Sequence, residues 1–427
     1  MKKILISMSA IALGALALTS CGGTTTTSKL TGADGEEITL KETSDSTEVS
    51  KALYAVGTKV TNTEKNVYAF QAKVTADANL NVEFGGYNIG AKLTADATVK
   101  ASLGKGVTYA KYEFDDEPTE EQVAAANEVI NKNVKLEATA TASLTTTAKK
   151  VEEELNAAET SEVDPVVAAL NNQTVSATAK AAKDDDTLYA SANVKASEGL
   201  MNTLTMFGVQ LGEGETTTSL DKDFGVKAKL NLGNVAVSIS NAVNSLREFD
   251  LNTIFPAETA TTSTTNASFY DSESFKMIVS YVEKLGVTIS SVKNGVVKFE
   301  LDLNGKKLND LTKVNADTAV SINAITTTNE SLFDDETSYV SAYVTVDVNK
   351  SSINAMGVNL KDISVFTSAL SAFAKYSSNT ALKMLSMAEI GGSIKLDAEY
   401  SFDDDVKFEL SKDSFDTKDY LTTTLAF

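Results

Sequence analysis

Residues 67–102 are VYAFQAKVTADANLNVEFGGYNIGAKLTADATVKAS, and this stretch decides the fold. From Val67 onward the hydrophobic period is two, and the alternation continues through residues 80–84. A period of two places successive side chains on opposite faces of a strand. The central Gly85-Gly86 pair tolerates the positive φ angles that tight hairpin turns require. The sequence therefore predicts an antiparallel hairpin whose second strand covers residues 87–102.

A short internal match supports this pairing. Residues 73–78 are KVTADA and residues 92–97 are KLTADA. Because the two segments lie so close in sequence, the match suggests neighbouring strands of one meander. Chance similarity in a chain rich in Ala and Thr is the alternative.

Two further hairpins are indicated by turn residues between alternating segments. Asn294-Gly295 separates residues 287–293 from residues 296–303, and Asn-Gly is among the strongest short-range hairpin signals. Gly233-Asn234 separates residues 227–232 from residues 235–240 in the same way. The sequence predicts a hairpin at both places.

Four amphipathic helices are predicted around these strands. In residues 46–63, apolar side chains recur at steps of four, three and four. In residues 272–285, an apolar stripe includes Phe275 and Val282. Gly286 follows this stripe and is a suitable residue to end a helix. The other two helices are predicted at residues 119–131 and 361–387. Apolar stripes of this kind most often pack on a sheet as ordinary core.

These elements predict an α+β fold of mainly antiparallel meanders, with amphipathic helices packed on one face of curved sheets. A Thr-, Ser- and Ala-rich stretch without a clear period suggests a boundary near residue 260. The predicted organisation is a signal peptide at 1–20, a lipidated flexible tether at 21–46, a first α+β domain at 47–260 and a second at 268–427. A tandem duplication of two similar halves stays open.

The N-terminus is typical of an exported protein. Lys2 and Lys3 precede an apolar run that ends at Leu18, which is too short for comfortable membrane spanning and is typical of a signal peptide. The junction Leu18-Thr19-Ser20-Cys21 resembles the lipobox of bacterial lipoproteins. The resemblance implies a diacylglyceryl group on Cys21 and cleavage before it. We therefore expect an extracytoplasmic protein held on the cell membrane by lipid, or on the outer membrane in a Gram-negative host.

Composition excludes several function classes. The chain has no histidine and one cysteine, Cys21, so histidine-based triads and zinc sites of Cys or His are excluded. The formal charge is −20, and removal of residues 1–20 deletes two lysines and no acid. Such a surface repels nucleic acid. We expect no cofactor, no metal and no nucleic-acid partner.

The candidate chemical motifs favour structural interpretations. Residues 85–92 have the glycine spacing of a P-loop but lack its Gly-Lys-Ser/Thr ending. Two Ser-x-x-Lys segments, at residues 102–105 and 290–293, lack the partner motifs of penicillin-recognising enzymes. Acidic clusters at residues 115–117, 184–186, 334–335 and 403–405 lack EF-hand spacing, so solvated turns are favoured over calcium sites.

The order of elements behind the lipobox resembles the half-barrel lipid-carrier lipoproteins, in which a curved antiparallel sheet wraps apolar helices around a cavity for acyl chains. No residue motif carries this resemblance, and the chain is about twice the usual size for that fold. Three functions remain: a non-catalytic lipoprotein that binds a lipid or other apolar ligand, a surface adhesin or protein-interaction lipoprotein, and, least favoured, a hydrolase that uses paired carboxylates.

Overall fold

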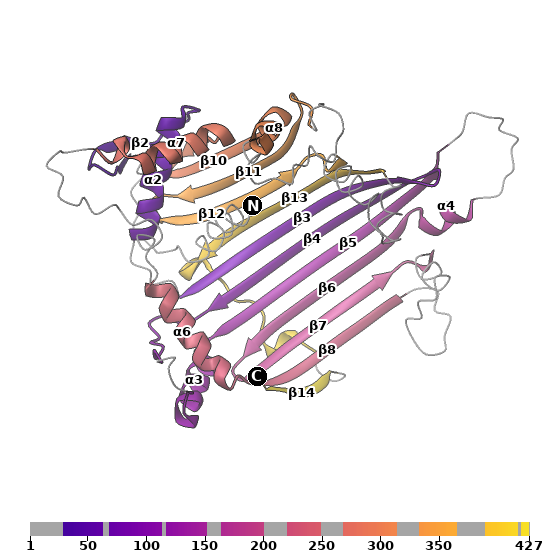
Figure 1. The fold of residues 1–427 in the computed structure, drawn as a ribbon. Coiled ribbons are helices and arrows are strands. Elements are labelled where there is room, and N and C mark those ends of the chain that lie inside the picture. The colour runs from indigo at the N-terminus through magenta and orange to yellow at the C-terminus, as the bar shows by residue number, and fades with distance from the viewer. Residues whose placement is uncertain are drawn as a thin grey trace, which may run out of the picture.

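A computed structural model describes residues 29–62, 68–112, 117–151, 164–199, 220–248, 268–313, 333–364, 389–416 and 420–426. Twelve strands of these residues form one sheet in the order β14-β8-β7-β6-β5-β4-β3-β13-β12-β11-β10-β9 (Figure 1). Neighbouring strands are antiparallel except β14, which is parallel to β8. Their bounds are β3 Ala69–Phe84, β4 Tyr87–Ser102, β5 Lys135–Lys150, β6 Gln173–Asp184, β7 Thr187–Ala196, β8 Leu220–Asn231, β9 Thr288–Lys293, β10 Val296–Asn304, β11 Ser338–Asp347, β12 Ser352–Leu360, β13 Glu389–Phe402 and β14 Leu421–Ala426. The predicted α+β class with mainly antiparallel strands is confirmed.

The hairpin predicted at residues 67–102 is confirmed as β3 and β4. The strands pair without a register shift from Ala69–Ser102 to Phe84–Tyr87. Gly85 and Gly86 have φ angles of 61° and 81°, which the turn requires. The two matching segments lie opposite each other, with Val74 paired to Ala97. The hairpin at Asn294-Gly295 is confirmed as β9 and β10.

The sheet continues across the predicted domain boundary. Strand β13 pairs with β3 along all fourteen of its residues, from Glu389–Glu83 to Phe402–Phe70. Residues 249–267, which contain the boundary, lie outside the described residues. The two halves therefore share one sheet, and their independent folding stays a prediction.

Three predicted helices are present as α2 Ser46–Asn62, α3 Glu120–Asn133 and α7 Glu273–Leu285. Gly286 ends α7 in the left-handed conformation, with φ 65°, as predicted. The described residues also form α4 Pro165–Leu170, α6 Asn234–Glu248 and α8 Gly305–Lys313, with short 3-10 helices η2 Phe269–Asp271, η4 Asp403–Asp405 and η5 Lys412–Ser414. Of the helix predicted at 361–387, residues 365–387 lie outside the described residues.

The hairpin predicted at Gly233-Asn234 is wrong, because its second strand is helix α6. The segment begins with an alternating Val-Ala-Val-Ser-Ile-Ser, which favours a strand locally. The buried residues are instead Ala236, Val237, Ser240, Asn241 and Val243, which lie on one face of a helix that packs against α3. The tertiary contact with α3 outweighs the local alternation.

The predicted flexible tether at 21–46 is folded from Lys29 onward. Strands β1 Lys29–Thr31 and β2 Glu37–Thr39 form a small hairpin. Leu30 and Leu40 are buried in the same core as α2 and α7. Burial of these leucines explains why the segment is ordered despite its polar composition.

The described helices cover the sheet at its margins. Helices α2 and α7 pack over β9, β10 and β11, where Val297 and Phe299 are buried. Helices α3 and α6 lie side by side at one end of the long strands, and α4 lies at the opposite end (Figure 1). Within the described part of the chain, the middle of the sheet is therefore available to form a surface.

Candidate functional site

The long strands divide the sheet into an apolar face and a polar face, because apolar and polar side chains alternate along each strand. Two rows of register partners on the apolar face cross β4 to β8. One row is Ala97, Ala140, Ala179, Ala192 and Phe224. The next row is Val99, Ala138, Ala181, Ala190 and Val226.

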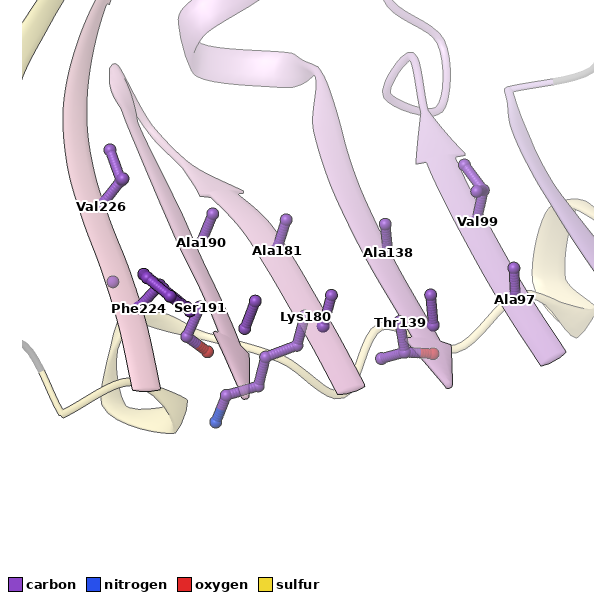
Figure 2. A pocket seen from close by; sticks show the side chains of 14 residues that line it. Ala97, Val99, Ala138, Thr139, Lys180, Ala181, Ala190, Ser191, Phe224 and Val226 are labelled. Carbon is purple, nitrogen blue, oxygen red and sulfur yellow. The ribbon is translucent and has the colours of Figure 1, made fainter. Parts of the chain in front are cut away.

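These two rows line a trough on the apolar face, which we call the alanine trough. Its volume is about 330 Å³, near the lower end of the roughly 300–1,000 Å³ range of ligand sites. Figure 2 shows the side chains of Ala138, Ala181 and Ala190 pointing to one side of the sheet, and those of Thr139 and Lys180 pointing to the other. The trough is thus lined mainly by methyl groups.

The alanine trough is exposed although its lining is apolar. The larger side chains at its two sides, Val99 and Phe224, keep 45% and 54% of their surface accessible. A contiguous exposed apolar surface on a soluble fold commonly marks a site that binds a lipid, a ligand or another protein. The small alanine side chains make the depression, because the larger Val99 and Phe224 rise on either side of them.

Lys183 is a buried cation on the apolar face, near the end of β6. Its Nζ atom donates hydrogen bonds to the carbonyl oxygens of Ile130, Asn131 and Val134, at 3.3, 3.0 and 2.9 Å. Burial lowers the pKa of Lys183, although the neighbouring aspartates of the β6–β7 turn act in the opposite sense. The three bonds tie the C-terminus of α3 to the sheet, so this ammonium has a structural role.

The polar face is crossed by a segment that the sequence did not predict. Residues 403–416, which we call the strap, lead from β13 in the middle of the sheet towards β14 at its edge. Glu137 Oε2 accepts hydrogen bonds from the backbone N–H groups of Glu409 and Leu410, at 2.6 and 2.8 Å. Phe415 stacks on Tyr189 with ring centroids 5.7 Å apart. Side chains of the sheet thus hold the backbone of the strap.

A buried ion pair lies under the strap. Lys100 Nζ is 2.6 Å from Glu137 Oε1 and also donates to the carbonyl oxygen of Lys407 at 2.6 Å. Burial by itself would raise the pKa of Glu137, but the hydrogen bonds from Leu410, Lys100 and Glu409 outweigh it and hold that pKa below its usual range. Glu137 is therefore ionised at neutral pH and fully engaged.

A second, polar depression of about 400 Å³ lies beside η4. It is lined by residues that include Lys132, Lys135 and Asp404. The buried Asp403 accepts hydrogen bonds from the backbone N–H groups of Tyr68 and Ala69, at 2.8 and 3.3 Å. These bonds fix the start of β3, so Asp403 has a structural role here.

The serine-lysine segments show no nucleophile paired with a base. Ser102 Oγ accepts a hydrogen bond from the N–H of Gly104, while Lys105 lies 3.4 Å from Asp404 Oδ2. In β9 the hydroxyl of Ser290 is buried, whereas Lys293 is exposed. Residues 85–92 form the β3–β4 turn and the start of β4, as the structural interpretation predicted.

The described acidic clusters lie at turns or in a short helix. Residues 184–186 form the β6–β7 turn, residues 334–335 precede β11, and residues 403–405 are η4. Residues 115 and 116 lie outside the described residues. Within the described ranges, no three or more Asp, Glu, His or Cys side chains come together as a metal site would require.

Cys21 lies outside the described residues, eight positions before β1 begins at Lys29. Among the helices that the structure describes, none has the length and apolar composition needed to cross a bilayer.

Comparisons with protein-family models, curated proteins and solved structures give no match for this chain. Its function must therefore be inferred from its own surface.

Proposed function

We propose that this protein is a non-catalytic lipoprotein, anchored outside the cytoplasm through Cys21, that binds the acyl chain of a lipid in the alanine trough. The observation that carries the proposal is an exposed trough lined by alanine and valine methyl groups across five strands. Each methylene moved from water into such a surface contributes about 0.8 kcal/mol, so even partial burial of a long chain supports binding.

The geometry favours an acyl chain over a flat or hydrogen-bonding ligand. The strands of the trough lie about 4.8 Å apart, so the rows of small side chains form a long and narrow surface. The polar side chains Thr139, Lys180 and Ser191 point to the opposite face. A ligand in the trough thus meets methyl groups and few groups that could satisfy polar atoms.

The first test is native mass spectrometry of a chain that lacks residues 1–21, secreted by its own host behind a signal peptide that is cleaved without lipidation and purified without detergent, followed by extraction of bound molecules. A stoichiometric lipid is the expected result. A protein that carries no lipid and binds no added fatty acid contradicts the proposal and favours the alternative, a surface adhesin or interaction protein.

Filling the trough should weaken lipid binding without unfolding the protein. Ala140 lies between Ala97 and Ala179 in one row and its side chain is exposed, so Ala140→Phe occupies the depression without displacing core. We expect about a tenfold loss of affinity for tritiated palmitate, which corresponds to about 1.4 kcal/mol. The matched control is Thr141→Phe, on the same strand but on the polar face, which should change the affinity less than twofold.

The anchor has a separate test. The intact mass of the membrane-extracted protein should equal that of a chain beginning at Cys21 plus a diacylglyceryl group, because the lipobox resemblance implies this processing. Replacing residues 1–21 with a signal peptide that is cleaved without lipidation should move the protein from the membrane fraction to the soluble fraction. A chain that keeps residues 1–20 and still fractionates with membranes contradicts the proposed anchor.

A further inference from the structure

We infer that the ligand of the alanine trough is a single-chain fatty acid anion whose carboxylate binds Lys222. This inference rests on the proposed function and names the head group and the chain number of the lipid. Lys222 lies on β8, in register with Val194 of β7 and two residues from Phe224. Because side chains alternate along β8, Lys222 and Phe224 lie on the same face.

The apolar face offers the ammonium group of Lys222 no acidic side chain on the described strands β4 to β8. Within the described strands β4 to β8, the residues whose side chains lie on the same face as the two rows include no aspartate or glutamate. They include two other lysines, and both have acceptors: Lys183 at the carbonyl groups of α3, and Lys150 at Asp164, 4.0 Å away. In a chain with a formal charge of −20, an exposed cation beside an apolar trough favours an anionic partner.

The two aspartates that flank Lys222 in sequence, Asp221 and Asp223, form polar contacts on the opposite face. Asn193 Nδ2 donates to both Asp221 and Asp223, at 2.9 Å in each case. Lys195 forms an ion pair with Asp221 at 3.0 Å. None of the described residues forms a hydrogen bond or ion pair with the ammonium of Lys222, so it can accept a ligand carboxylate.

The position of Lys222 suits a head group. The trough contains the row that ends at Phe224, and Lys222 ends the next row, about 7 Å farther along the strand. Strand β14 begins to pair with β8 only at Val226, so among the described strands Lys222 lies at an open sheet edge. An acyl chain in the trough can therefore place its carboxylate at the edge, in contact with water. The small volume of about 330 Å³ favours one chain over two.

The test compares tritiated palmitate with tritiated 1-hexadecanol, which has the same chain and no charge. We expect the chain without residues 1–21 to prefer palmitate about fivefold at low ionic strength, and the preference to shrink as salt is added. Lys222→Gln should remove the preference and leave hexadecanol affinity unchanged, and Lys222→Arg should keep it. The control Lys195→Gln, on the adjacent strand and the polar face, should also keep it.

The outcomes separate the two proposals. If both ligands bind and Lys222→Gln keeps the palmitate preference, the head-group assignment is overturned while the proposed function stands. If neither ligand binds, the proposed function itself fails. If neither binds and the chain sediments as a dimer that Ala140→Phe dissociates, the apolar face is occupied by a second copy and both proposals fail.

Discussion

Glu137→Gln should lower the free energy of unfolding by about 3–5 kcal/mol, because removing one partner of a buried ion pair leaves the other charge unpaired. The Lys100 and Glu137 side chains are only 9% and 3% exposed. Glutamine also offers one acceptor oxygen in place of the two that Glu137 presents to Lys100, Glu409 and Leu410. Urea titration measures the effect as a lower midpoint, with the slope unchanged if only stability is altered.

The matched control is Glu37→Gln, which removes the same charge from a surface pair. Lys29 and Glu37 are 2.7 Å apart, but their side chains are 57% and 61% exposed. Such pairs contribute about 1 kcal/mol or less. A loss at Glu137 no larger than the loss at Glu37 would show that the strap does not depend on the buried pair.

The effect of Glu137→Gln should depend on pH. The folded protein holds the pKa of Glu137 below its usual range, whereas the unfolded chain has a value of about 4.3. The stabilisation is thus complete above the unfolded value and is lost as the pH falls through the folded value. The difference in unfolding free energy between the wild type and Glu137→Gln should shrink when the titrations are repeated in steps from pH 7 towards pH 3.

Gly392→Ala should be the second severe change, with an expected loss of about 2–5 kcal/mol from backbone strain and steric clash. Gly392 has a φ angle of 127°, and a Cβ atom there would lie 1.9 Å from the backbone oxygen of Asn79. That oxygen belongs to β3, so β13 and β3 would have to separate locally. Thermal and urea unfolding both measure the loss.

Gly391→Ala is the matched control, because a Cβ atom at Gly391 would have only the Cβ of Ser364 nearby, at 3.9 Å. It should change stability by about 1 kcal/mol or less. Equal effects of the two substitutions would contradict the predicted clash. If the Gly392→Ala protein unfolds in two transitions, the two predicted domains on either side of residue 260 unfold separately.

Local sequence patterns predicted the elements best where one signal was strong. The Gly85-Gly86 and Asn294-Gly295 turns form as predicted because their residues adopt positive φ angles. Helix α7 ends at Gly286 for the same reason. At residues 235–240 the local alternation indicated a strand, but packing against α3 selected a helix.

The sequence indicates only the kind of residues that line the candidate site, and does not indicate how they are aligned across the strands. Alternating small and polar residues in β4, β5 and β6 place alanine side chains on one face, but we predicted no site at these residues. The register that aligns Ala97 with Ala140 and Ala179 could not be obtained from periodicity alone, since a slip of two residues keeps the same faces. Neither Lys222 nor the strap has a sequence motif.

The sequence by itself determined what depends on neighbouring residues: the strand period, the helical stripes, the turn glycines and the acidic charge. Tertiary structure alone decided that β13 pairs with β3 and that Glu137 binds a backbone segment 272 residues away. It also decided that Val99 and Phe224 of the apolar face stay exposed. The physical reason is that local steric preferences act within a few residues. Contacts between distant segments depend instead on which surfaces are buried together once the chain has folded.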